Sequence, residues 1–135
     1  MSDKRRTRLI AVGGATIAAL AVWLIAKLAS VPVVAPTGTG GKLQDISIVA
    51  VILTAVFASL AGWALLAILE KFTGKARVVW LSIAIIFFLL SLFGPLTAAG
   101  VGAGTKASLL FMHIAVAAVV IPLLGRTARS GEAVA

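Results

Sequence analysis

The sequence contains no cysteine, no asparagine and only one histidine. Without cysteine the chain has no disulfide, no thiolate nucleophile, no cysteine-bound zinc and no cysteine-bound iron–sulfur cluster. Without asparagine it has no acceptor for N-glycosylation. Charged residues make up only 12% of the chain, compared with about 25% in soluble domains. These shortages exclude cysteine-based chemistry and point away from a soluble protein.

Apolar residues are abundant instead. They make up 61% of the 135 residues, and the mean hydropathy is +1.17. A domain of this size cannot bury so much apolar surface in a fold that faces water on all sides. The composition therefore predicts an integral membrane protein with one compact unit and no separate soluble domain.

Four apolar segments are long enough to cross a bilayer, since a helix of about 20 residues spans roughly 30 Å of hydrocarbon. They cover about residues 9–28, 46–69, 78–96 and 107–124. The predicted fold class is an all-α integral membrane protein with four transmembrane helices in an antiparallel bundle. We place this domain at 9–125, between a basic N-terminal tail at 1–8 and a C-terminal tail at 126–135, both cytoplasmic.

The linkers between these segments carry capping and turn signals. Asp45 and Thr105 are good N-cap residues, so we expect them to cap the second and fourth helices. Gly94–Pro95 should end the third helix, because glycine and proline both disfavour a continuing helix. Pro122 should bend or end the fourth helix, because proline lacks the backbone N–H that continues a helix.

Basic residues are distributed unevenly between the two sides of the predicted bundle. Nine lie on the side of the termini: Lys4, Arg5, Arg6, Arg8, Lys71, Lys75, Arg77, Arg126 and Arg129. Three lie on the opposite side: Lys27, Lys42 and Lys106. The positive-inside rule then places both termini in the cytoplasm, with the helices in the cell inner (plasma) membrane. The net charge of +8 sits at helix ends, which favours anionic lipids as partners over nucleic acid.

The first apolar segment also has the basic start of a secretory signal peptide. Its apolar core is longer than the usual h-region of about 7–15 residues. The sequence "KLAS" is a poor cleavage site, because Lys27 stands where a small residue is needed. We therefore expect the segment to remain as the first transmembrane helix.

His113 lies inside the apolar run "SLLFMHIAV" (108–116), whereas all four carboxylates lie in tails, loops or span ends. Ionisable residues in hydrocarbon are costly and are the first functional candidates. Ser91 and Thr54 reach a similar depth, so we expect His113 to form a hydrogen bond with one of them or with a backbone carbonyl freed near Gly94–Pro95. An interhelical bond of this kind would be worth about 0.6–2 kcal/mol. The alternative is that these residues contact a ligand. We expect no metal site, because one histidine supplies too few ligands, and no cofactor.

Small and aromatic residues suggest how the helices pack. Pairs of small residues four positions apart allow helices to approach closely, as at Gly14 and Ala18 or Ala58 and Gly62. Trp23 and Trp80 fall near the two membrane interfaces, where indole rings gather. Trp63 lies deeper, where we expect it to pack inside the bundle or to contact lipid, with stacking on a ligand as the lesser alternative.

The last third of the chain resembles a known family. "SLFGPLTAA" (91–99) followed by "TKASLLFMHIAVAAVVIPLLGRTAR" (105–129) is similar to a family of small four-span membrane proteins of unknown function that are common in actinobacteria. The matching features are Ser91, Gly94–Pro95, Thr97, Thr105, Met112–His113 and Ile121–Pro122. The resemblance implies a four-helix bundle in a bacterial inner membrane and no established activity.

The sequence predicts a non-catalytic accessory or interaction subunit, which forms a homo-oligomer or joins a larger membrane complex. The alternative is a small transporter or binder of a lipophilic ligand, with a site near His113 in the outer half of the bundle. Small multidrug exporters of similar size depend on an embedded acidic residue, and the first span has none. We do not expect an enzyme, because no serine has a histidine and an acid arranged around it in the sequence.

Overall fold

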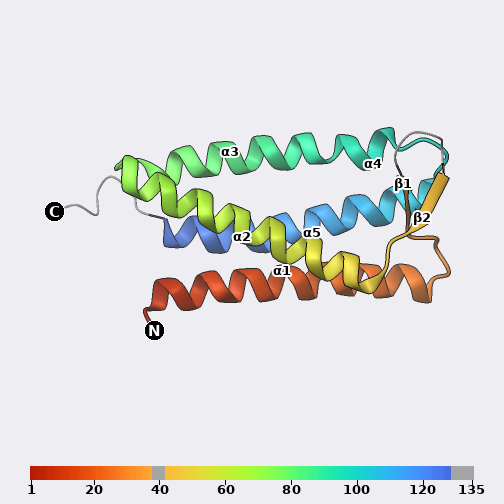
Figure 1. Ribbon diagram of the computed structural model, residues 1–135, viewed down its shortest axis with the longest axis horizontal. Helices are drawn as coiled ribbons and strands as arrows, with labels where there is room; N and C mark the ends of the chain where they lie inside the picture. Colours follow the sequence, from red (N-terminus) through yellow and green to blue (C-terminus); the bar gives the residue numbers. More distant parts are fainter. Residues whose placement is uncertain (38–41, 129–135) are drawn as a thin grey trace.

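The computed structural model describes residues 1–37 and 42–128, which form a bundle of long helices (Figure 1). The helices are α1 (Asp3–Leu28), α2 (Ile48–Phe72), α3 (Ala76–Ser91), α4 (Phe93–Thr97) and α5 (Ala103–Thr127). A small antiparallel hairpin of β1 (Val34–Thr37) and β2 (Lys42–Asp45) joins α1 to α2. Residues 129–135, which include Arg129, and the linker residues 38–41 lie outside the described residues.

Within the described residues, four helical segments are long and apolar enough to cross a membrane, with α3 and α4 forming one segment. The shortest, Ala76–Thr97, has 22 residues, or about 33 Å at 1.5 Å per residue. That length matches the roughly 30 Å thickness of the hydrocarbon layer. Large apolar side chains such as Ile17, Phe57 and Phe111 are exposed on the outside of the bundle. The predicted fold class of four transmembrane helices is confirmed.

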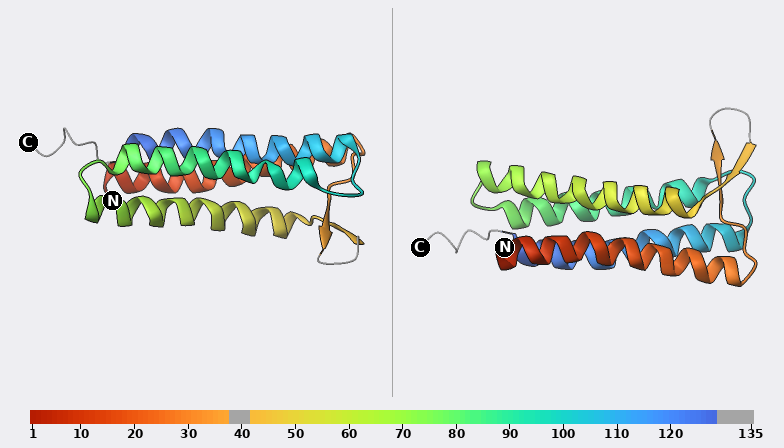
Figure 2. Two further views of the ribbon diagram at one scale, coloured as in Figure 1. Left: turned by 90° about the horizontal axis from the view of Figure 1, so that it is seen from above. Right: turned by 60° about the horizontal axis from the view of Figure 1, so that its bottom comes forward.

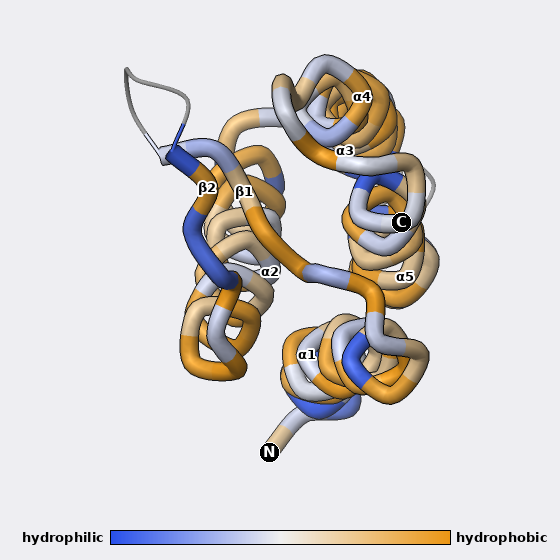
Figure 3. The backbone as a smooth tube through the Cα atoms, turned by 90° about the vertical axis from the view of Figure 1, so that its right-hand side faces the viewer, coloured by the Kyte–Doolittle hydropathy of each residue, from blue (hydrophilic) through white to orange (hydrophobic). Residues whose placement is uncertain are grey.

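Consecutive long helices run in opposite directions (Figure 1). α1 packs mainly against α5 and α2, and α3 lies against α2 and α5, as the views in Figure 2 also show. The starts of α1 and α3 meet the ends of α2 and α5 at one end, which we call the basic end. It carries Lys4, Arg5, Arg6, Arg8, Lys71, Lys75, Arg77 and Arg126. The β1–β2 hairpin lies at the opposite end of the bundle, which we call the hairpin end. Viewed from the hairpin end, all four helices carry apolar residues (Figure 3).

Small residues set the close approach of α1 to its neighbours. Ala11, Ala15 and Ala19 recur every four residues on α1, and all three are buried. A Cβ added at Gly14 would lie 3.2 Å from Cγ1 of Val119 on α5. Association of helices in a membrane depends on this kind of van der Waals packing, because lipid tails are as apolar as the side chains. The predicted role of Gly14 in close helix packing is confirmed.

The caps of α2 and α5 differ from those predicted. Ser47, and not Asp45, caps α2: its hydroxyl accepts a hydrogen bond from the backbone N–H of Ala50 at 3.1 Å. Asp45 is instead the last residue of β2. Gly102 is the N-cap of α5, so Thr105 lies within the helix, where its side chain donates to the carbonyl of Pro32. Both predictions were wrong for the same reason. A neighbouring residue, Ser47 or Gly102, takes the N-cap position, and the predicted residue is held elsewhere: Asp45 pairs in the hairpin and Thr105 bonds to Pro32.

Neither proline ends a helix at its own position. α3 ends at Ser91, before Gly94–Pro95, and Pro95 lies in the first turn of α4, where a missing N–H leaves no helical hydrogen bond unmade. Pro122 does not end α5, which continues to Thr127. An interior proline removes only the bond to the carbonyl four residues earlier, here that of Ala118. Packing of the last turn of α5 in the bundle outweighs that loss.

Candidate ligand site

A cavity of about 590 Å³ lies between the four long helices. Ligand pockets usually measure about 300–1,000 Å³, so the volume suits a small molecule. Alanine makes up much of the wall, and Gly62 joins it, so many short side chains face one another across the middle of the bundle. The alanines are Ala19, Ala50, Ala55, Ala58, Ala61, Ala84 and Ala117. The cavity is present because these residues are too small to fill the space between the helices.

The cavity opens toward the side of the bundle between α2 and α3. Thr54, Ala58 and Ala61 on α2 and Phe87 on α3 line it and are also exposed on the outer surface. Val51 and Met112, on other parts of the wall, are buried. For a helix bundle in a bilayer, this opening faces the hydrocarbon layer, so the cavity is open to molecules dissolved in the lipid.

All three residues that the sequence singles out line this one cavity. Thr54 comes from α2, Ser91 from the last turn of α3 and His113 from α5. Among the described residues of the wall, His113 is the only ionisable one. α5 begins at Ala103, so His113 lies ten residues into the helix, or about 15 Å from its start, whereas the predicted span at 107–124 begins six residues before it.

The predicted interhelical hydrogen bond does not form between these residues in the described structure. Nδ1 of His113 donates to the carbonyl of Leu109 at 2.7 Å, and the hydroxyl of Ser91 donates to the carbonyl of Phe88 at 2.6 Å. Both acceptors belong to the same helix as the donor. Side chains in helices often reach the carbonyl three or four residues earlier, and this satisfies their protons without a partner on another helix.

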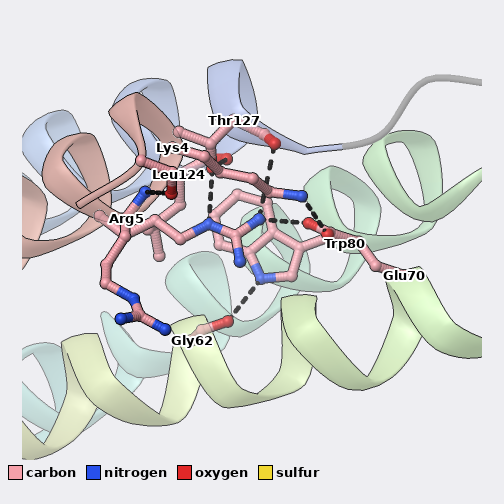
Figure 4. Close-up of polar contacts among 9 residues, drawn as sticks. Lys4, Arg5, Gly62, Glu70, Trp80, Leu124 and Thr127 are labelled. Carbon is pink, nitrogen blue, oxygen red and sulfur yellow. Dashed lines mark hydrogen bonds and ion pairs between the residues drawn. The ribbon is translucent and has the colours of Figure 1, made fainter. Parts of the chain in front are cut away.

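Trp80 forms part of the cavity wall. Its side chain is 1% exposed, and its Nε1 donates to the carbonyl of Gly62 on α2 at 2.9 Å (Figure 4). Residues of α5 such as Leu124 also pack around the ring, so Trp80 belongs to the core, and its place near the inner interface stays a prediction. Trp23 lies near the hairpin end, where its Nε1 donates to the carbonyl of Ile46 at 2.9 Å. Trp63 is partly buried against the core at the basic end, as predicted.

A second polar group, which we call the basic-end cluster, consists of Lys4, Arg8, Glu70 and Thr127. Arg8 and Lys4 both form ion pairs with Glu70 (Figure 4). Nε of Arg8 donates to the hydroxyl of Thr127 at 2.9 Å. The cluster thus joins α1, α2 and α5. Sequence reasoning counted Arg8 only as a topology signal. Arg8 lies on the same face of α1 as the buried alanines, a face that the sequence alone does not single out.

A family model matches residues 1–130 of the chain. The chain belongs to the DUF6069 family. The family is described as one of unknown function, so membership identifies the relatives of the chain and not its activity. The match extends far beyond residues 91–129, where the sequence itself suggested a resemblance.

No curated protein and no solved structure matches this DUF6069 chain. Assigning a role therefore depends on the geometry of the cavity and the basic-end cluster. Within residues 1–37 and 42–128, no three histidine, aspartate or glutamate side chains are grouped as metal ligands would be. The cavity, with Thr54, Ser91 and His113 on its wall, is the site that offers both space and polar groups.

Proposed function

We propose that this DUF6069 protein is a non-catalytic, multi-pass membrane protein that binds a lipophilic molecule in the cavity between its helices. The observation that carries the proposal is an apolar cavity of about 590 Å³ with an opening on the outer side of α2 and α3. A ligand dissolved in the hydrocarbon layer can enter by this route without crossing water. Binding sites for small molecules typically combine an apolar wall with a few polar groups, and this wall does so.

The chemistry of the wall supports binding over catalysis. His113 is the one ionisable group among the described wall residues. Two of these residues, Thr54 and Ser91, carry hydroxyl groups. Acid–base or nucleophilic catalysis needs a second group that orients or activates the first. A single imidazole and two hydroxyls can orient a ligand by hydrogen bonding.

We propose that the protein lies in the inner (plasma) membrane of a bacterium, with the basic end in the cytoplasm. The resemblance of residues 91–129 to small four-span proteins common in actinobacteria supports a bacterial membrane. Eight of the described basic residues lie at the basic end, and three lie at the hairpin end. This asymmetry supports the orientation by the positive-inside rule. It also supports anionic lipid headgroups as partners around the basic end.

A second function, that of an accessory subunit, is favoured by one specific feature. Ala58 and Ala61 are exposed small residues at the opening on α2. Small residues on an outer helix face let another transmembrane helix approach closely. A helix of a partner protein, or of a second copy of this chain, would then cover the opening.

Two neighbouring alanines on α5 provide a matched test. Ala117 lines the cavity, whereas Ala118 is exposed and lies outside its wall. Ala117→Phe should fill the cavity, and Ala118→Phe should add the same ring on the outer surface. The full chain and both variants are extracted gently from their own membrane and examined by native mass spectrometry.

We expect the unchanged chain and Ala118→Phe to carry the same small lipophilic molecule, and Ala117→Phe to lose it. Equal retention by all three, or no bound molecule in any of them, would contradict the ligand-binding proposal. Co-release of a protein partner or a second copy without a small molecule would favour the accessory role instead.

A further inference from the structure

Three of the side-chain hydrogen-bond donors on the cavity wall already have a backbone carbonyl as their acceptor. Nδ1 of His113 donates to the carbonyl of Leu109 at 2.7 Å, and Nε1 of Trp80 donates to the carbonyl of Gly62 at 2.9 Å. The hydroxyl of Ser91 donates its one proton to the carbonyl of Phe88 at 2.6 Å. A backbone carbonyl can only accept, so in each pair the side chain supplies the proton.

The groups that remain available on the wall are therefore mainly acceptors. In neutral imidazole, a proton on Nδ1 leaves Nε2 with a lone pair and no hydrogen. The oxygen of Ser91 likewise keeps its lone pairs after donating. The side chain of Thr54 has no hydrogen bond among the described residues, and its hydroxyl can rotate to donate or accept, so it gives no preference.

Nε2 of His113 is also accessible. In the described part of the chain, every buried side-chain nitrogen or oxygen has a hydrogen-bond partner. Nε2 has no hydrogen-bond partner among the described residues, so it is not one of the buried atoms. His113, which carries Nε2, lines the cavity. An acceptor without a partner in an apolar wall gains most from a ligand that brings its own donor.

We infer that the cavity selects lipophilic molecules whose polar group donates a hydrogen bond, such as phenols and long-chain alcohols, with Nε2 of His113 as the acceptor. Ethers and ketones of the same size are disfavoured, because they bring a second acceptor to a wall that already presents acceptors. This inference rests on the proposed function, since it assumes that the cavity binds a ligand.

Because His113 is the only histidine, its ring can be observed without assignment. The full chain is prepared in detergent with ring-¹⁵N histidine, and its imidazole nitrogens are followed by NMR. The probes are 4-hexylphenol and 4-hexylanisole, which differ only in replacement of the phenol proton by a methyl group. Ala117→Phe in the same detergent provides the reference for partitioning into the micelle.

We expect the free protein to show the tautomer with its proton on Nδ1. Adding 4-hexylphenol should shift the Nε2 signal, and 4-hexylanisole should leave it nearly unchanged. The phenol should bind about three- to tenfold more tightly, which is the contribution of one net hydrogen bond. In His113→Phe both probes should bind with similar affinity, and Ser91→Ala should keep most of the preference.

The outcomes separate the two proposals. Equal binding of both probes to the unchanged chain, or a proton found on Nε2, would overturn the preference for donors while leaving a lipophilic site. No binding of either probe beyond that of Ala117→Phe would overturn the ligand site itself. The NMR measurement uses the unchanged chain, so it decides the question even where His113→Phe fails to fold.

Discussion

Arg8 on α1 and Glu70 on α2 form an ion pair, although 62 positions separate them in the chain. Their side chains are only 6% and 10% exposed. Arg8 also donates to the hydroxyl of Thr127 at 2.9 Å, so one guanidinium contacts both α2 and α5. Arginine suits such a position because its planar group presents several donors in fixed directions. The pair fixes how α1 lies against the two helices around it.

Removing the charge of Glu70 should destabilise the bundle. Glu70→Gln keeps the shape of the side chain but leaves the charge of Arg8 buried without its counter-ion. Breaking a buried pair from one side costs about 3–5 kcal/mol, and water near the headgroups lowers this, so we expect about 2–3 kcal/mol. The measurement is unfolding of the purified chain by detergent titration.

Two lysines serve as controls for that experiment. Lys4 also pairs with Glu70, but its side chain is 41% exposed, so Lys4→Gln should change the free energy of unfolding by less than about 1 kcal/mol. Lys71 follows Glu70 directly and is exposed, so Lys71→Gln should have little effect. A loss in Glu70→Gln no larger than in Lys71→Gln would show that the pair does not stabilise the bundle.

The close contact between α1 and α5 can be tested with adjacent glycines. A Cβ at Gly14 would lie 3.2 Å from Val119, whereas a Cβ at Gly13 would meet nothing within 4 Å. Gly14→Val should therefore force the helices apart and lower stability by about 1–3 kcal/mol, as overpacking does. Gly13→Val adds the same side chain toward the outside and should have a smaller effect. Equal melting temperatures for the two variants would contradict this packing.

The helices were predictable because many consecutive residues indicate each of them, so the prediction does not depend on any single residue. About 20 consecutive apolar residues indicate a membrane span, whichever residue begins or ends it. Caps depend on one residue among several suitable ones: Asp45 and Ser47 are both good caps, and pairing of Asp45 in β2 leaves the role to Ser47. The expectation that α5 could end at Pro122 was wrong. The rule for proline gives the free-energy cost of a proline inside a helix, and the packing of α5 in the bundle exceeds that cost.

The site was predictable in its polar residues and not in its shape. Thr54, Ser91 and His113 stand out because polar groups are rare in these spans, and all three line the cavity. The cavity itself arises from small residues such as Ala84 and Ala117. In helices that are apolar on every side, no pattern tells which alanines face inward. Ion pairs between distant helices, such as Arg8 with Glu70, are hidden for the same reason.

The link between the hairpin end and α5 gives another prediction. The side chain of Thr105 is 3% exposed and donates to the carbonyl of Pro32, 73 positions away. Thr105→Val keeps the shape but removes the hydroxyl, and should cost about 1–2 kcal/mol because the site is buried. Thr97 is exposed and bonds within its own helix, so Thr97→Val is the matched control. Similar unfolding curves for both variants would show that the Thr105 bond adds nothing.

The absence of cysteine makes the orientation directly testable, because any cysteine introduced is the only thiol in the chain. Thr37 ends β1 at the hairpin end, and Gly74 lies between α2 and α3 at the basic end; both are exposed. A Cβ at Gly74 meets nothing within 4 Å, so a cysteine fits there. In intact cells, an impermeant maleimide should label Thr37→Cys and spare Gly74→Cys, since the basic end faces the cytoplasm. After the cells are opened, both should be labelled equally. The reverse pattern in intact cells would place the basic end outside, which would mean that the eight basic residues there do not set the orientation.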